Sequence, residues 1–213
     1  GNKIFKTFSP RASISYEFIP SWKINASVGR YYKILPYTML GYRDQNNILV
    51  NQNSDYTRSD HIVLGLSKEI SKASSISLEG FYKKYSNYPV SIRDGVSIAN
   101  KGGGFEVLGN EPISTDGKGE SYGLEFLFQQ KLTKNFYGIF SYTFFYSKFS
   151  GEEVDEYLPS VWDSRHLFSF TGGYKFKRNW ELSLRWRFAG KNPFVPVDID
   201  ATTPIYPNIV LDY

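Results

Sequence analysis

Residues Trp162–Pro196 read WDSRHLFSFTGGYKFKRNWELSLRWRFAGKNPFVP and contain two alternating segments joined by a tight turn. In the second segment every other residue from Trp180 to Phe188 is apolar, and the residues between them are polar or charged. Successive side chains of a β-strand point to opposite faces, so this segment has one apolar face and one polar face. The stretch therefore predicts a β-hairpin whose two faces meet different surroundings.

The same alternation recurs along the chain and predicts about eight strands. Their expected ranges are Arg11–Phe18, Trp22–Tyr32, Asp60–Ile70, Ile76–Ile92, Gly119–Leu132, Phe136–Phe149, Arg165–Phe176 and Trp180–Ala189. Short turns alternate strictly with long loops, which are expected at Lys33–Arg58, Arg93–Lys118 and Ser150–Asp163. The proline-containing tail Gly190–Tyr213 is expected to form a loop.

Loop lengths and strand lengths together favour a β-barrel in a membrane over a soluble sheet. Transmembrane barrels have short turns at one end and long loops at the other, whereas the Greek-key connections of sandwiches are not sorted in this way. A strand of about 11 residues tilted by about 45° covers about 25 Å, the height of the apolar band of such barrels. In lipid every backbone N–H and C=O must be paired, so the sheet has to close. The expected fold is therefore all-β, an antiparallel up-and-down transmembrane β-barrel.

The composition agrees with strands that meet a membrane interface. The chain has 213 residues, of which 17 are Phe, 17 are Tyr and 4 are Trp, together 18%. Aromatic residues favour strands, and Tyr and Trp suit the boundary between membrane and water. No run of about 18 apolar residues occurs, so no transmembrane helix is expected. The mean hydropathy of -0.38 fits a barrel, because only every second strand residue must be apolar.

The charges and the lack of cysteine argue against several function classes. The 25 basic and 21 acidic side chains give a net charge of +4 without a Lys/Arg run, so nucleic acid is not an expected partner. The chain has no cysteine, which excludes disulfides and Cys-based zinc sites. His, Asp and Glu do not cluster at ligand spacing, so neither a metal site nor a cofactor is expected.

The two histidines, His61 and His166, give little support for catalysis. His166 follows Asp163 and Ser164 closely, which superficially offers the three residue types of a hydrolase triad. A triad is defined by geometry, and neighbouring residues of an extended strand point apart. We therefore expect no enzymatic activity. An enzyme that processes membrane lipids with His166 and a nearby Ser is kept as an alternative.

Five short motifs occur in order along nearly the whole chain. They are Phe8-Ser9-Pro10-Arg11, the GESYGLE segment Gly119–Glu125, Ser141-Tyr142-Thr143, the WDSRH segment Trp162–His166 and the RFAGKNPFVP segment Arg187–Pro196. Each motif alone is weak, but their order and spacing resemble the C-terminal half of the barrel of TonB-dependent outer-membrane receptors, of the type common in Bacteroidetes.

The resemblance implies a location in the bacterial outer membrane and active uptake of a scarce nutrient, such as a metal chelate, a vitamin or a glycan. In that family an N-terminal plug fills a barrel of about 22 strands, and the plug contacts a TonB-type energy-coupling protein. Residues 1–213 would then form part of the barrel domain, without the plug. The implied partners are outer-membrane lipid, the plug, the coupling protein and a small-molecule or glycan ligand.

Two sets of residues are candidates for contacts. Exposed positions in the long loops predict ligand contacts from Tyr37, Tyr42, Arg43 and Arg93. Polar strand positions predict lumen-facing side chains at Arg11, Glu17, Glu125, Glu181, Arg185 and Arg187. The alternative architecture is a self-contained eight-stranded outer-membrane barrel with a structural or adhesive role.

Overall fold

A single antiparallel sheet runs through the computed structural model, which describes residues 7–102, 108–152, 156–193 and 203–205. Its strands are β1 (Arg11–Ile19), β2 (Trp22–Lys33), β3 (Thr57–Ser71), β4 (Ser74–Ser91), β5 (Ile113–Thr133), β6 (Phe136–Phe149), β7 (Leu158–Pro159), β8 (His166–Lys175) and β9 (Glu181–Ala189). They lie side by side in the order β1-β2-β3-β4-β5-β6-β8-β9, and the short β7 pairs with β6. Short helices lie at α1 (Tyr37–Leu40), η2 (Lys177–Asn179) and η3 (Thr203–Ile205). None of the helices in the described ranges is long and apolar enough to cross a membrane.

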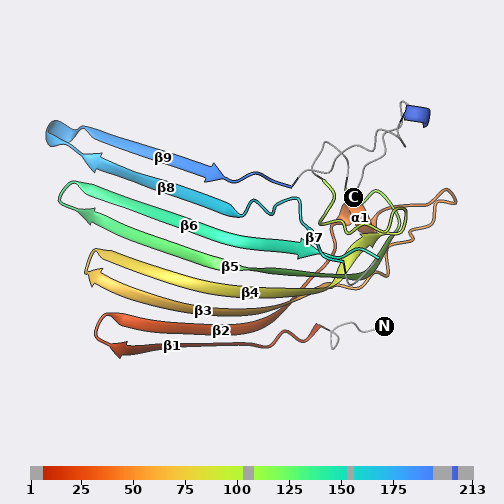
Figure 1. The fold of residues 1–213 in the computed structure, drawn as a ribbon, viewed down its shortest axis with the longest axis horizontal. Helices are drawn as coiled ribbons and strands as arrows, with labels where there is room; N and C mark the ends of the chain where they lie inside the picture. The colour runs from red at the N-terminus through yellow and green to blue at the C-terminus, as the bar shows by residue number, and fades with distance from the viewer. Residues whose placement is uncertain (1–6, 103–107, 153–155, 194–202, 206–213) are drawn as a thin grey trace.

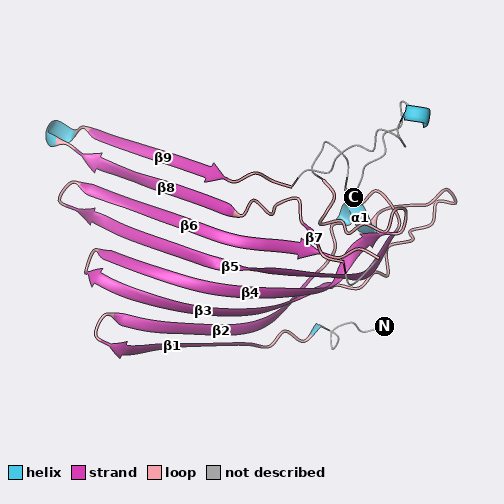
Figure 2. Ribbon diagram, in the orientation of Figure 1, coloured by secondary structure: helices cyan, strands magenta, loops and turns pink. Residues whose placement is uncertain are grey.

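Connections of different length are sorted to opposite ends of the sheet. Figure 1 shows tight turns at one end and the long connections, α1 and β7 at the other. Figure 2 shows the same sorting, with strands along the length of the molecule and most of the irregular chain at one end. Ser21, Lys134 and Arg178 take φ angles of 71°, 55° and 63° in the short turns, as tight hairpin turns require. The alternation of short turns and long loops predicted from the sequence is confirmed.

The observed strands follow the expected ones, with the largest difference at β5. β6 has its expected range, but β5 begins at Ile113 instead of Gly119. Ile113 pairs with Ser91 and Ser114 with Val90, so backbone pairing to β4 holds a segment whose sequence shows no alternation. Most of the tail Gly190–Tyr213 lies outside the described residues.

One face of the sheet is apolar from edge to edge. Cross-strand pairing brings one residue from each long strand into a single row. The row consists of Tyr16, Ile24, Leu66, Leu78, Phe126, Tyr142, Phe168 and Phe188. In the described chain this face is largely open, since Leu64 and Leu184 are each 60% exposed. An apolar face of this extent needs apolar surroundings, which a lipid bilayer provides.

The apolar band shifts along the strands from one side of the sheet to the other. On β4 the band runs from Tyr82 to Ile76. The row that contains Ile76 reaches Trp186 on β9. There the band continues past Trp186 to Trp180, next to the short turn. The band therefore crosses the strands obliquely.

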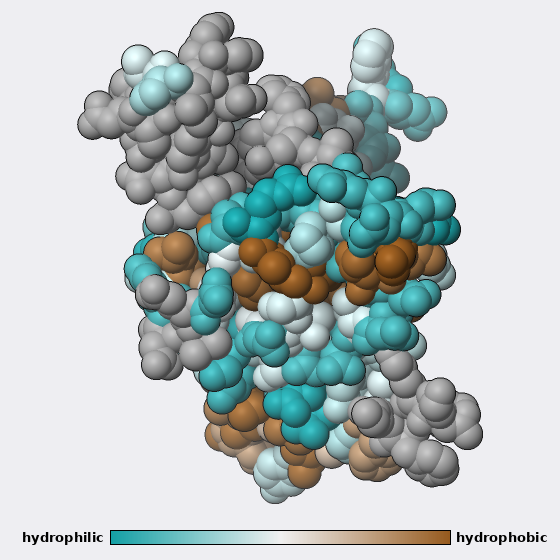
Figure 3. Space-filling model, turned by 90° about the vertical axis from the view of Figure 1, so that its right-hand side faces the viewer, coloured by the Kyte–Doolittle hydropathy of each residue, from teal (hydrophilic) through white to brown (hydrophobic). Residues whose placement is uncertain are grey.

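The buried core lies at the end of the long connections, over the polar face of the sheet. Leu35, Met39, Ile98 and Ile113 form its apolar cluster, with relative exposures of 4% to 6%. Figure 3 looks onto this end and shows mostly hydrophilic residues around a central hydrophobic band. The long connections thus cover one face of the sheet and leave the apolar face free.

The sheet is open at both edges. In the described part of the chain, β1 pairs with β2 alone and β9 with β8 alone. The antiparallel all-β fold of a barrel segment is confirmed. The alternative of a barrel closed by these strands themselves is not what the structure shows, because β1 and β9 do not meet.

Candidate ligand-binding site

Asn51 ties the connection after β2 to the start of β5. Its side-chain amide donates to the carbonyls of Met39 and Glu111 at 2.9 and 2.8 Å and accepts from the Ile113 N–H at 3.1 Å. The residue is 2% exposed. Because buried polar groups need partners, a fully bonded amide of this kind fixes the two segments relative to each other.

Asn100 and Lys101 tie the second long connection to its neighbours. Asn100 donates to the carbonyls of both β7 residues at 2.9 Å. The ammonium group of Lys101, which is 7% exposed, forms ion pairs with Asp94 at 2.5 Å and with Glu111 at 3.1 Å. A buried charge is costly without such partners. All three long connections are therefore interlocked at this end.

A pocket of about 440 Å³ lies between these connections and the polar face of the sheet. Aromatic residues contribute much of its lining, namely Tyr31, Tyr32, Tyr85, Tyr88, Phe149 and Trp162. Small-molecule sites are concave, largely apolar and of this size, with a few polar groups that orient the ligand. The pocket is the candidate site for a small ligand.

Phe149 is the centre of the aromatic lining. The centroid of its ring lies 4.4 Å from that of Tyr88, 5.2 Å from that of Tyr85 and 6.1 Å from that of Trp162. The Trp162 indole N–H also donates to the hydroxyl of Ser147 at 3.2 Å. These distances fall in the range of attractive ring pairs. The rings hold one another in fixed orientations.

Gly119 makes the position of Phe149 possible. The two residues are direct partners between β5 and β6. A Cβ atom on Gly119 would lie 2.2 Å from Cδ1 of Phe149, so any larger residue would displace the ring. Gly119 belongs to the GESYGLE motif noted in the sequence, which gives this glycine a packing role.

Polar and charged groups lie at the β2–β3 side of the pocket. The rings of Tyr31 and His61 are 4.5 Å apart, and the guanidinium of Arg11 lies 4.3 Å from the centre of the Tyr31 ring. Nε2 of His61 is hydrogen-bonded to the hydroxyl of Ser59 at 2.5 Å. This side of the pocket can donate hydrogen bonds and favours electron-rich or anionic groups.

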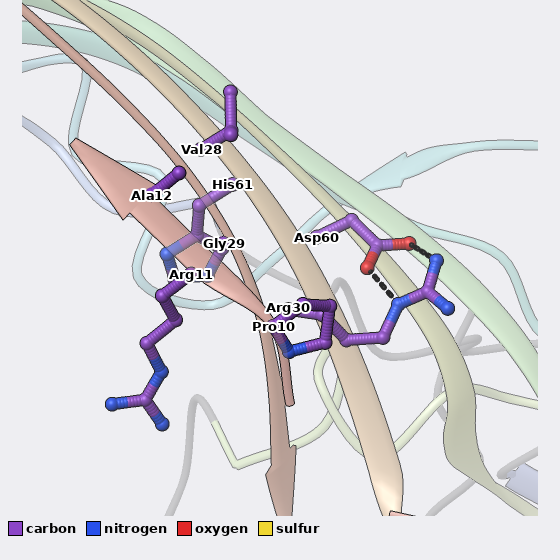
Figure 4. A pocket seen from close by; sticks show the side chains of 8 residues that line it. All are labelled: Pro10, Arg11, Ala12, Val28, Gly29, Arg30, Asp60 and His61. Carbon is purple, nitrogen blue, oxygen red and sulfur yellow. Dashed lines mark hydrogen bonds and ion pairs between the residues drawn. The ribbon is translucent and has the colours of Figure 1, made fainter. Parts of the chain in front are cut away.

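A second hollow, of about 520 Å³, lies beside the edge of the sheet at β1. Figure 4 shows Arg30 and Asp60 joined on one side of the strands, by hydrogen bonds of 2.6 and 3.1 Å, and Arg11 extending on the other side. β1 begins at Arg11 whereas β2 continues to Lys33, so the hollow straddles the edge. Its lining includes residues from both faces of the sheet.

The loop residues predicted to contact ligand lie at the same end of the sheet as the aromatic pocket but outside its lining. Tyr37, on α1, is 83% exposed, and Tyr42 is half-buried. Arg43 donates to the carbonyl of Asn47 at 2.7 Å, and Arg93 is exposed. The structure does not bring the four side chains together around the pocket, and their contact with ligand stays a prediction.

The six strand residues predicted to face a lumen share the polar face of the sheet. These residues are Arg11, Glu17, Glu125, Glu181, Arg185 and Arg187. Glu125 lies directly opposite Glu79 on β4 and Thr143 on β6. That this face lines a lumen remains a prediction.

His166 lies on the apolar face, away from the pocket. Its Nδ1 atom is hydrogen-bonded to the hydroxyl of Tyr142 at 2.9 Å. The hydroxyl of Ser164 donates to an asparagine side chain at 2.5 Å, and Asp163 accepts from Arg165 at 3.1 Å. The three residue types of the suspected triad are therefore not connected by the hydrogen bonds that a triad needs.

The aromatic pocket was not predicted from the sequence, because most of its aromatic residues lie within expected strands and Trp162 lies in an expected loop. Tyr31, Tyr85 and Phe149 interrupt the polar alternation of their strands close to a long loop. An aromatic residue in a polar register at a loop-proximal strand end was the available signal. Trp162 and Tyr88 gave no comparable signal, since the third loop and the irregular end of β4 bring them there.

Similar folds occur among receptors of known structure. They include the ferripyoverdine receptor of the outer membrane of Pseudomonas aeruginosa, the alcaligin outer-membrane receptor FauA from Bordetella pertussis and the ferric-catecholate import receptor Fiu from K12 E. coli. Their TM-scores are 0.60, 0.56 and 0.58, at 17%, 17% and 14% identity. The matches cover 89%, 86% and 85% of this chain but only 23%, 29% and 25% of those chains. The chain thus spans about a quarter of the length of these proteins, and the likeness shows a shared fold.

Sequence comparison gives a more specific assignment. No curated protein matches the chain. The family model described as TonB dependent receptor-like, beta-barrel, matches residues 1–212. Because this match extends over nearly the whole sequence, the chain belongs to the TonB-dependent receptor-like β-barrel family of the bacterial outer membrane.

Proposed function

We propose that the chain supplies part of the barrel of an outer-membrane transporter that takes up a scarce small nutrient. A metal chelate is the first class to consider, ahead of a vitamin or a glycan. Proteins of known structure with this fold support placing metal chelates first, since they include receptors for ferripyoverdine, alcaligin and ferric catecholate and a copper transporter.

The aromatic pocket is the observation that carries the proposal. It combines tilted and edge-to-face aromatic rings with tyrosine hydroxyls, and the guanidinium of Arg11 contacts the Tyr31 ring from outside the lining. Flat, electron-rich ligands with acidic groups, such as aromatic metal chelates, match that combination through ring contacts and cation–π or ionic contacts. The pocket also lies at the end of the long connections, which in transmembrane barrels is the external end.

Further barrel strands, a plug and a coupling protein would complete the transporter. Residues 1–213 would form about a third of a barrel of about 22 strands, with a plug in the lumen and a TonB-type coupling protein on the periplasmic side. The polar face would then line the lumen, with the Arg and Glu residues described above exposed to water or to the plug. Tyr37, Tyr42, Arg43 and Arg93 would contact the ligand at the rim, before it reaches the pocket.

Replacing Trp162 tests the proposal directly. In the full-length protein we expect Trp162→Ala to lower the affinity for the transported ferric chelate about tenfold or more. Trp162 is 45% exposed at the pocket, so a bound ligand can cover its ring, and Trp residues that a partner covers rank among the largest contributors to binding. The measurement is uptake and surface binding of radiolabelled ferric complexes, with hydroxamate, catecholate and mixed chelators as probes, in cells whose own copy of the gene is deleted.

Trp180→Ala is the matched control, since Trp180 is 73% exposed at the opposite end of the sheet. This variant should bind the chelate like the unaltered protein. Uptake of every probe at the normal rate after deletion of the gene would contradict the metal-chelate class. Uptake that is lost on deletion but unaffected by Trp162→Ala would contradict the role of the pocket.

A further inference from the structure

Three tyrosines form a row on the apolar face at its boundary with the long connections. Tyr82, Tyr122 and Tyr146 are cross-strand partners on β4, β5 and β6. Their rings stack, with centroids 6.4 and 5.2 Å apart. Tyrosines at this position are typical of the interfacial girdle of a membrane barrel. The row therefore marks the level at which lipid tails give way to headgroups.

An apolar groove of about 450 Å³ begins at this row and extends toward the short turns. Its centre is Gly80, which lies between Leu64 and Leu124 in the cross-strand register. Each neighbour carries a large side chain whereas Gly80 carries none, so the surface is hollowed there. The groove opens outward, on the face that meets lipid, and has the character of a slot for a hydrocarbon chain.

Charged side chains lie on the other side of the tyrosine row. Two residues beyond the tyrosine row, on the same face of the sheet, cross-strand pairing aligns Arg30, Asp60, Lys84, Glu120 and Lys148. Arg30 and Asp60 form an ion pair, with 2.6 Å between Nε of Arg30 and Oδ1 of Asp60. Within the described part of the chain, no carboxylate lies within 4.0 Å of the ammonium groups of Lys84 and Lys148. The ammonium group of Lys148 lies 5.9 Å from the centre of the Tyr146 ring, a contact that leaves its donors free to bind an external anion, as are those of Lys84.

The surroundings of Lys84 and Lys148 strengthen the positive character of this surface. Lys118 lies on the same face of β5 and is exposed. The guanidinium of Arg165 lies 4.1 Å from the centre of the Tyr146 ring. Glu120, between the two lysines in the register, accepts a hydrogen bond from the Tyr82 hydroxyl at 3.2 Å. Basic groups therefore outnumber acidic ones just beyond the tyrosines.

We propose that this surface binds a phosphorylated lipid of the outer leaflet, with an acyl chain in the groove at Gly80 and a phosphate between Lys84 and Lys148. The two lysines are separated by one strand, so their backbones lie about 10 Å apart, and their long side chains can converge on one phosphate. The order of these layers matches an anionic lipid. The apolar groove would hold the acyl chain, the tyrosine row lies at the boundary between tail and headgroup, and the lysines would bind the headgroup phosphate. Lysine ammonium groups bind phosphate as point charges.

The test uses the full-length protein in detergent, with diphosphoryl lipid A as the probe and native mass spectrometry as the readout. The double variant Lys84→Gln/Lys148→Gln should lower the affinity for lipid A about tenfold. Gly80→Leu should also lower it, because the new side chain fills the groove. A Cβ at Gly80 meets Leu124 at 3.5 Å, an ordinary contact, so this variant is expected to fold.

Lys72→Gln/Lys177→Gln is the charge-matched control, because both of these lysines lie in short turns at the opposite end. It should bind lipid A like the unaltered protein. Heat-modifiable migration in detergent confirms that each variant is folded. Unchanged lipid A binding by folded Lys84→Gln/Lys148→Gln would overturn the proposal. Displacement of lipid A by an equal concentration of inorganic phosphate would also overturn it, since it would show a site for free phosphate.

The lipid site is independent of the proposed transport function. Lys84, Lys148 and Gly80 do not line the aromatic pocket. The lysine variant should therefore lose lipid A while retaining binding of the ferric chelate. Trp162→Ala should do the reverse, so that failure of one proposal leaves the other to be judged by its own variant.

Discussion

Gly119 shows how one missing side chain shapes the candidate site. Phe149 occupies the space that a Cβ on Gly119 would need, at 2.2 Å from its ring. The ring is 2% exposed and packs against Tyr85 and Tyr88, so it cannot move without changing the pocket. We expect Gly119→Ala to destabilise the full-length protein by about 1–3 kcal/mol, as overpacking does, and to weaken ligand binding. The midpoint of urea unfolding in detergent micelles measures the loss.

Gly80→Ala is the matched substitution on the opposite face of the sheet. A Cβ at Gly80 meets its nearest neighbour at 3.5 Å, so the unfolding midpoint should hardly change. Adding Phe149→Leu to Gly119→Ala should restore part of the stability, because the smaller side chain relieves the clash. If Gly119→Ala alone left the midpoint unchanged, the tight contact with Phe149 would not exist in solution.

The interlocked connections behave as elements with their own stability. Asn51→Ala removes two donors and one acceptor that are buried between the connection after β2 and the start of β5. Each backbone group left without a partner costs about 1–3 kcal/mol. We expect the variant to open the connection locally while the strands stay paired. Faster proteolysis and faster amide exchange within residues 34–56 would report this opening.

Asn46→Ala serves as the comparison, because Asn46 is an exposed asparagine of the same connection. Its exchange rates should match those of the unaltered protein. Equal protection of residues 34–56 in the Asn51 and Asn46 variants would contradict the anchoring role of Asn51.

Alternation predicts those elements whose two faces meet different solvents. β6 has its predicted range, and the ends of β1, β2, β3, β8 and β9 fall close to the predicted ones, because lipid and water impose a period of two on them. The start of β5 and the helix α1 were missed. Both lie beyond the apolar band, at the end of the long connections. There the backbone conformation depends on pairing with β4 and on packing of the connections, and not on alternating polarity.

From the sequence, only the end of the molecule that holds the candidate site could be predicted, and not the residues that line it. The long loops indicated the end at which the aromatic pocket lies. The lining itself depends on long-range contacts, such as Phe149 with Tyr88 and Trp162, which join β6, β4 and the third connection. Tyr37 and Arg93 were chosen because they lie in long loops, whereas the pocket is lined by side chains from strands and loops that only the fold brings together.

At the scale of the whole molecule, the two open edges require neighbours. All residues of β1 and β9 are exposed in the described chain, and each strand pairs on one side only. In lipid an unpaired strand edge is not tolerated. We expect the outer amides of β1 and β9 to be protected from hydrogen exchange in the full-length protein and to exchange rapidly in the isolated 213-residue chain in detergent.

β4 provides the internal reference, because it is paired on both sides by β3 and β5. Its amides should be protected in both samples. Slow exchange of β1 and β9 in a monomeric isolated chain would mean that the two edges close on each other, and the self-contained barrel would return as the better architecture.

The oblique course of the apolar band sets the angle at which the chain crosses the bilayer. Trp186 shares the row of Ile76, and the band on β9 ends at Trp180, six residues farther along. Six residues advance by about 20 Å, while the four steps from β4 to β9 span about 19 Å. If the apolar band lies parallel to the membrane plane, the strands are tilted by about 45° from the membrane normal. This angle is close to the 35–45° of membrane barrels. Figure 1 shows the short turns stepping outward from β1–β2 to β8–β9. The strands therefore wind helically around the barrel axis. The pitch of this winding can be calculated from the offset of hydrophobic residues between neighbouring strands.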